Sequence, residues 1–376
     1  MKIKFLLLLF IPAFIHAESM YSPSWGFFID LPAGYEYVDG DSRNRFSFSG
    51  PMGLMFDLVV YSGVYRTIDE LVNDANRKLS NQGDITFFDY NNKQAALIRL
   101  NFGDSVGWGI CVELDPSVAP GKLSALLALA YGPGGNDDLE LFHLSSLDSI
   151  APTRADRLYP GPIMEFTNPR GEARDIPLAI KGLSAMIYEN DAEAAQILIE
   201  REYLIYSAYL NTPYLMDAAI RYYRFIYRDS YDRVLDAVSA IARYYDGYTA
   251  LTDEQKRDFA RKALAFVQGF SYERDLDLNK SDFVNLVSAV TEGRGDCDSR
   301  ATLFAMIIAN ANIRSAIMLS PYYSHAMGLA DIAGYGARFE SHGIPFLVAE
   351  TTAKIDIGLI DQEISDISRW FAVIFE

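Results

Sequence analysis

The chain has 376 residues, of which 50% are hydrophobic and 13% aromatic. This composition excludes an intrinsically disordered chain, and the length provides for packed cores in two or three domains. The formal net charge of −17 repels nucleic acid and anionic lipid surfaces at long range, so we expect no nucleic-acid partner.

The first seventeen residues, MKIKFLLLLFIPAFIHA, have the pattern of a secretory signal peptide. Lys2 and Lys4 precede an apolar run over residues 5–15, and Ala17 ends the segment. An uncleaved anchor is the alternative, but the run is short for a bilayer and Pro12 interrupts it. We expect cleavage after Ala17, a secreted or periplasmic protein with a charge near −19 once the two lysines are lost from −17, and no integral membrane segment thereafter.

Residues 18–155 are predicted to form an N-terminal α+β domain. Thr67 begins a helical pattern over residues 67–79, a hairpin should turn at Asn91-Asn92, and residues 138–150 fit a closing helix. Apolar runs punctuated by Gly, Pro and Asp predict strands at 25–32, 45–50, 54–63, 108–115 and 123–132, the last of which could also be a helix.

The opening segment of this domain, WGFFIDLPAGYEY, resembles the start of the α/β/α sandwich found in the P-subunit of the photosystem II oxygen-evolving complex. The resemblance concerns about a third of the chain and implies a fold without a catalytic residue. His143 is accordingly expected to be a core or surface residue of the closing helix.

The middle of the chain changes character. A Pro- and Gly-rich passage predicts a linker at residues 156–177, and residues 178–250 fit a period of 3.6 residues and predict a helical region. Its tyrosines could stack on sugar rings, but we favour half-buried helix faces with solvated hydroxyls. These tyrosines are Tyr222, Tyr223, Tyr227 and Tyr231.

Residues 251–376 are predicted to form a C-terminal domain in which a helix packs on an antiparallel sheet. Thr252 begins a capping box for a first helix. Residues 275–283 alternate as a calcium loop would, but Lys280 takes the place of the required glycine and Leu286 that of the bidentate glutamate. We therefore expect a polar loop there, and no metal.

The segment GRGDCDSR, residues 293–300, places Cys297 at the start of an apolar helix. Free N–H groups at a helix start favour the thiolate, so Cys297 is predicted to be a nucleophile. The flanking Asp296 and Asp298 should cap the helix, because no histidine or second cysteine stands at metal-ligand spacing. The Arg-Gly-Asp tripeptide could serve a receptor only on a protruding loop, and we expect it to be held against the domain.

Cys111 lies in a strand pattern and is expected to be core. The sequence does not decide whether Cys111 and Cys297 form a disulfide, although we favour a free Cys297.

Two further residues complete a catalytic pattern. His325 heads one expected strand and would take the thiol proton, and Glu350 lies near the end of another and would orient the imidazole. The backbone N–H of Cys297 would donate to an oxyanion, and His342, in a loop, is a reserve candidate for the base. The strands are expected at 313–321, 324–332 and 344–352.

Residues 260–365 resemble the transglutaminase-like superfamily, a papain-related fold. The matching segments are FVQGFSY (266–272), GDCDSRATLFAMIIANANI (295–313), HAMGLA (325–330) and FLVAETTAKIDIG (346–358). The resemblance implies a catalytic triad of Cys297, His325 and Glu350 that acts without a cofactor. It also implies acyl transfer through a thioester, by proteolysis, amidase action or amide exchange on a peptide or protein substrate.

Two positions depart from the family pattern. Glu350 stands where aspartate is usual, and Met327 stands where a tryptophan often follows the histidine. The alternative to an enzyme is therefore an inactive envelope protein that uses the same fold for binding or scaffolding. The expected compartment suggests cell-wall peptides as the substrate of an active enzyme.

Overall fold

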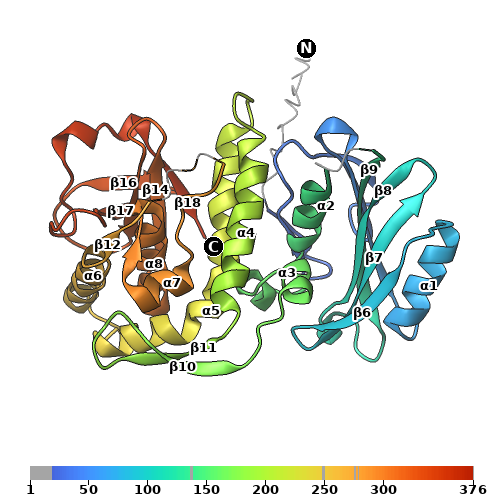
Figure 1. Ribbon diagram of the computed structural model, residues 1–376, viewed down its shortest axis with the longest axis horizontal. Coiled ribbons are helices and arrows are strands. Elements are labelled where there is room, and N and C mark those ends of the chain that lie inside the picture. Colours follow the sequence, from blue (N-terminus) through green and yellow to red (C-terminus); the bar gives the residue numbers. More distant parts are fainter. Residues whose placement is uncertain (1–18, 136–138, 248–249, 275–276, 278, 376) are drawn as a thin grey trace, which may run out of the picture.

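The structure is a computed structural model that describes residues 19–135, 139–247, 250–274, 277 and 279–375. The expected signal peptide at 1–17 lies outside the described residues, as does part of the 275–283 loop. The fold is α+β, as expected, with two antiparallel sheets separated by a pair of long helices (Figure 1). No helix in the described part of the chain has the length and apolar character needed to cross a membrane.

The N-terminal half is built on an antiparallel sheet with the strand order β3-β4-β5-β9-β8-β7-β6. Its strands are β3 (Glu36–Gly40), β4 (Arg45–Ser49), β5 (Met55–Ser62), β6 (Ile85–Tyr90), β7 (Lys93–Phe102), β8 (Ser105–Glu113) and β9 (Ser124–Pro133). The hairpin between β6 and β7 turns at Asn91-Asn92, both with positive φ, as the primed turn requires. The ambiguous segment at 123–132 is a strand, and β3 is an addition to the expected strands.

Helices cover both faces of this sheet (Figure 1). Helix α1 (Ile68–Lys78) is capped by the Thr67 side chain and buries its apolar face against β7 and β8. Helix α2 (Leu139–Asp148) packs on the opposite face and contains His143, which is 3% exposed and therefore a core residue. A short ladder of β1 (Met20–Tyr21) and β2 (Phe28–Ile29) accompanies the sheet.

The passage expected to be a linker contains regular structure. It forms α3 (Pro162–Thr167) and β10 (Ala173–Pro177), and β10 pairs with β11 (Ser184–Tyr188). The helical prediction for 178–250 is therefore wrong at residues 184–188, where buried and exposed side chains alternate along β11. Short 3₁₀ helices are η1 (Pro51–Gly53), η2 (Pro116–Val118), η3 (Ala155–Leu158), η4 (Gln362–Ile364) and η5 (Ile367–Arg369).

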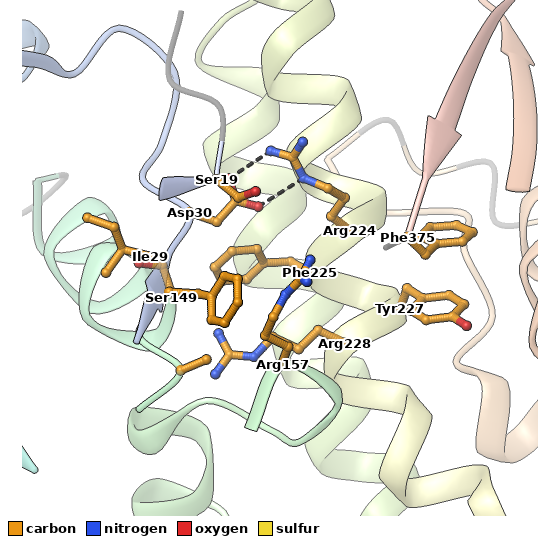
Figure 2. A pocket seen from close by; sticks show the side chains of 12 residues that line it. Ser19, Ile29, Asp30, Ser149, Arg157, Arg224, Phe225, Tyr227, Arg228 and Phe375 are labelled. Carbon is orange, nitrogen blue, oxygen red and sulfur yellow. Dashed lines mark hydrogen bonds and ion pairs between the residues drawn. The ribbon is translucent and has the colours of Figure 1, made fainter. Parts of the chain in front are cut away.

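Two helices, α4 (Asp191–Ser207) and α5 (Leu215–Tyr244), lie between the two sheets (Figure 1). Helix α5 is tied to the N-terminal half by Arg224, which forms a bidentate ion pair with Asp30 at 2.7 and 2.9 Å (Figure 2). Helices α4 and α5 are also joined through charged side chains, since Arg221 bonds Glu202 at 2.8 Å in a buried setting.

The C-terminal half has a second antiparallel sheet with the order β16-β17-β15-β14-β18. Its strands are β14 (Ser315–Ser320), β15 (His325–Ala330), β16 (Arg338–Ser341), β17 (Ile344–Ala349) and β18 (Phe371–Ile374). Its helices are α6 (Asp253–Gln268), α7 (Leu286–Glu292) and α8 (Cys297–Asn310), with a short parallel pair of β12 (Ser271–Tyr272) and β13 (Arg294–Gly295). The capping box predicted at Thr252 is present.

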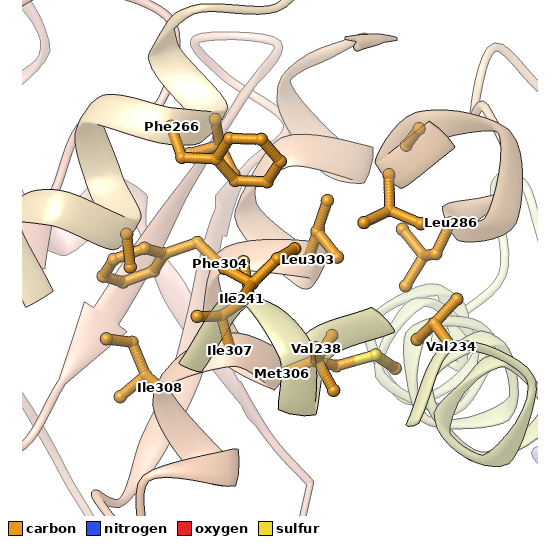
Figure 3. Packing of buried hydrophobic residues seen from close by; sticks show 14 of the residues in the cluster. Val234, Val238, Ile241, Phe266, Leu286, Leu303, Phe304, Met306, Ile307 and Ile308 are labelled. Atoms are coloured by element: carbon orange, nitrogen blue, oxygen red, sulfur yellow. The ribbon is translucent and has the colours of Figure 1, made fainter. Parts of the chain in front are cut away.

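A single apolar core joins α5 to α6, α7 and α8 (Figure 3). Val238 and Ile241 of α5 contribute to the same cluster as Phe266 of α6 and Phe304 of α8. The residues expected to form a separate helical region therefore share their core with the C-terminal domain.

Candidate active site

Cys297 is the first residue of α8, the central helix of the C-terminal half. The Asp296 carboxylate caps this helix as expected, accepting from the backbone N–H of Ser299 at 2.9 Å. Asp296 is 1% exposed, and Arg294 is bonded to Glu292 and Glu273. The Arg-Gly-Asp tripeptide is thus held within the domain, because its acidic residue is engaged by the helix.

Helix α8 approaches strand β15 closely because residue 328 is a glycine. A Cβ atom at Gly328 would lie 2.4 Å from the Phe304 ring, well inside contact distance. The missing side chain lets the middle of α8 pack closely on β15, and the backbone of Ala326, the second residue of β15, acts to lower the pKa of the Cys297 thiol. The nucleophile candidate is thereby placed beside the residue that follows His325.

His325 and Glu350 are joined directly. The His325 Nε2 atom lies 2.7 Å from Glu350 Oε2, and the other carboxylate oxygen accepts from the Thr352 backbone N–H at 2.7 Å and its hydroxyl at 2.6 Å. Burial alone would raise the pKa of Glu350, but the bonds from His325 and Thr352 outweigh it and hold the pKa below its usual value. Glu350 is therefore an anion at neutral pH, suited to orient the ring and support an imidazolium.

Trp370 packs against His325 in a T-shaped arrangement, with the two ring centroids 6.1 Å apart. Met327 is fully buried on β15. The aromatic neighbour of His325 therefore comes from the segment before β18. It does not come from position 327, where the family pattern has a tryptophan and this chain has Met327.

Cys297 and His325 line one pocket of about 240 Å³. Residues of α4 and α5 form its other wall, so the pocket opens between the long helix pair and the second sheet. The side chains on that wall are Tyr203, Tyr206, Ala219, Tyr222 and Tyr223. One side chain of a peptide substrate, or a short stretch of its backbone, would fit a space of this size.

The resting thiol is not activated as the helix start alone would predict. Burial and the nearby carboxylates of Asp298 and Asp296 raise the pKa of Cys297 well above its ordinary value. The thiol lies 3.4 Å from Asp298 Oδ1, and the hydroxyl of Tyr223 donates to Asp298 Oδ2 at 2.6 Å. Cys297 is consequently a neutral thiol that can react only after a base has removed its proton.

The possible metal ligands at the site are Asp296, Cys297 and Asp298, whose ligand atoms lie within 4.8 Å of one another. The Asp298 oxygens accept from Tyr223 and from the thiol, and one Asp296 oxygen caps α8. Asp296 Oδ2 is buried and has no hydrogen-bond partner among the described residues, so hydrogen bonds account for only part of this arrangement.

The remaining candidate residues lie elsewhere. His342 is at an exposed turn between β16 and β17 and bonds the neighbouring Ser341 hydroxyl. Cys111 is fully buried under α1, and both cysteines are free thiols. Sequence reasoning did not single out Thr352 or Trp370, and it expected solvated hydroxyls on tyrosines such as Tyr223. The segment Glu350-Thr351-Thr352, part of the family resemblance, could have drawn attention to Thr352, but no local sequence pattern marked Trp370 or Tyr223.

No family model and no curated protein sequence matches the chain. Among solved structures, PsbP from the cyanobacterium Synechocystis is similar over 36% of this chain and 91% of its own, with 15% identity and a TM-score of 0.26. A Bacteroides thetaiotaomicron protein is similar over 56% and 77%, with 9% identity and a TM-score of 0.22. A provisionally named protease from Parabacteroides distasonis is similar over 81% and 68%, with 9% identity and a TM-score of 0.23.

Proposed function

We propose that the protein is a transglutaminase-like cysteine hydrolase or acyl-transferase that acts on amide bonds in a secreted or periplasmic setting. The observation that carries the proposal is the 2.7 Å bond between His325 and Glu350, at the edge of a pocket that Cys297 also lines. The α+β C-terminal half, in which α8 packs on β14 and β15, is the frame that such a domain requires.

The proposed reaction begins with a proton transfer. His325 uses Nε2 to bond Glu350, which leaves Nδ1 to accept the thiol proton as the Cys297 sulfur attacks the substrate carbonyl carbon. The Cys297 backbone N–H, which lacks an intrahelical partner because it stands at the first position of α8, donates to the oxyanion. The imidazolium then protonates the leaving amine, a thioester remains on Cys297, and water or a second amine releases the acyl group.

The experiment is acylation of the full chain with p-nitrophenyl acetate, read by intact mass and peptide mapping. We expect one acetyl group on Cys297, lost in Cys297→Ala and strongly slowed in His325→Ala and Glu350→Gln. His342→Ala is the matched control, since it removes an exposed histidine outside the pocket. Equal acylation rates in the His325 and His342 variants would contradict the proposed base.

The second candidate is a non-enzymatic binding module built on the same frame. It is favoured by the neutral state of Cys297, which is 9% exposed and whose pKa is raised by burial and Asp298. An absence of any acyl-Cys297 in the folded wild type, with Cys297 still reactive after unfolding, would select this candidate.

A further inference from the structure

A second pocket lies away from the candidate active site, where β2, η3 and α5 meet (Figure 2). It has a volume of about 60 Å³, and its walls include Phe28, Asp30, Arg157, Arg224, Phe225 and Arg228. Phe375, near the C-terminus, closes one side and stacks on Tyr227 with ring centroids 4.0 Å apart. Nothing in the proposed reaction uses this pocket.

Two of its three arginines are paired within the protein. Arg224 forms the bidentate pair with Asp30. Arg228 donates to three backbone carbonyl oxygens, those of Asp148 and Ile150 at 2.7 Å and that of Tyr159 at 3.1 Å. These bonds fix both guanidinium groups against the pocket wall.

Arg157 differs from the other two. Its guanidinium carbon lies 4.6 Å from the centre of the Phe28 ring, and among the described residues it has no hydrogen bond or ion pair. The group offers five N–H donors, and none of its nitrogens is sealed from solvent, so an acceptor on a ligand can reach them. It is held in place by a ring while its donors stay available.

The charges around Arg157 do not balance. Burial lowers the pKa of Arg157, repulsion from Arg154 lowers it further, Asp30 opposes this in part, and Arg228 and Arg224 add to the repulsion. The first pocket is lined by Asp30 against Arg157, Arg224 and Arg228, and the neighbouring pocket by Asp115 against Arg154 and Arg157. An additional negative charge here would relieve repulsion that the protein leaves uncompensated.

We propose that this pocket binds the carboxylate or phosphate group of a small molecule, with Arg157 as its principal ligand. The planar fork of a guanidinium matches two oxygens of either group, and the Phe28 and Phe225 rings offer apolar contact beside it. A space of about 60 Å³ accommodates the anionic group alone. The neighbouring pocket of about 430 Å³, which shares Phe28 and Arg157, has room for the remainder of the ligand.

The test is thermal unfolding and calorimetric titration of the full chain with sodium phosphate and, separately, sodium acetate, each against sodium chloride at the same ionic strength. We expect phosphate or acetate to raise the melting temperature above the chloride reference, and Arg157→Gln to weaken the binding by about tenfold or more. Which anion binds tells the two chemistries apart.

The matched control is Arg66→Gln, which removes one exposed positive charge at a distant site and should bind as the wild type does. Arg157→Lys keeps the charge and loses the fork, so it should bind more weakly than wild type while remaining folded. Equal shifts in chloride, or equal binding by the Arg157→Gln and Arg66→Gln chains, would overturn the proposal. The site is independent of Cys297, so loss of acylation in Cys297→Ala leaves this outcome unchanged.

Discussion

The carboxylate of Asp298 is expected to set the reactivity of Cys297, and Asp298→Asn tests this directly. Asparagine keeps the shape of the side chain and removes its negative charge. The thiol lies 3.4 Å from Asp298 Oδ1. A thiolate and a carboxylate at that separation repel by about 5 kcal/mol at an effective dielectric constant of ~20.

The measurable effect is smaller than this figure, because burial raises the pKa of Asp298 and weakens its hold on the negative charge, although the Tyr223 bond opposes that shift. A third of the energy would still change the thiolate population by about tenfold, since ~1.4 kcal/mol corresponds to a factor of ten. We therefore expect Asp298→Asn to label with iodoacetamide at least about tenfold faster than wild type at neutral pH.

The assay is the rate of Cys297 alkylation, followed by peptide mass across neutral and alkaline pH. Cys111 is an internal reference, because its full burial raises its pKa and prevents labelling in the folded chain. Asp282→Asn is the control variant, as Asp282 lines the same pocket but is paired with Arg274 at 2.7 Å. An Asp298→Asn chain that labels at the wild-type rate at every pH would refute the reasoning.

Two further predictions concern stability. Burial lowers the pKa of His143 from 6.5 to about 4, so the unfolded chain binds a proton at a higher pH than the folded chain does. Stability is therefore lost as the pH falls from 6.5 to about 4, by up to about 3 kcal/mol. Urea unfolding at these two pH values should show a smaller loss in His143→Gln, and an unchanged loss would exclude this histidine as the cause. Arg233 is fully buried between Asp229 and Asp191. Arg233→Met should cost about 3–5 kcal/mol in the free energy of unfolding, because the buried Asp229 loses its ion pair, whereas Asp191 keeps Arg170 at 2.8 Å. A cost below about 1 kcal/mol would show that Asp229 finds another partner or a proton.

The elements that the sequence predicted well are those whose signals are local. Thr67 and Thr252 mark helix starts through their own side chains, and Asn91-Asn92 marks a turn through its tolerance of positive φ. The same holds for the start of α8 at Cys297, where Asp296 is the cap. Each of these depends on contacts within a few residues, so no knowledge of the rest of the chain is needed.

The misread elements depend on distant contacts. Strand β11 can be taken for a helix until its partner β10 is known, because its apolar residues are consecutive and show no alternation, so that the ladder decides the conformation. Tyr223 and Trp370 come to the site from α5 and from the segment before β18, and only the folded arrangement puts them beside Asp298 and His325. The raised pKa of Cys297 was missed for the same reason. The helix start that favours the thiolate can be read from neighbouring residues, but the burial that raises the pKa depends on residues distant in the sequence.

Helix α5 belongs to both halves of the molecule. Ala218, near its start, packs in the core of the first sheet, whereas Val234 and Ile241, toward its end, pack with α8. If the chain were divided between the halves, the half that kept α5 would expose to water the apolar residues that pack against the other half. Neither half is therefore an autonomous module that could be transplanted into another polypeptide, and a substitution in one is felt by the folding of the other.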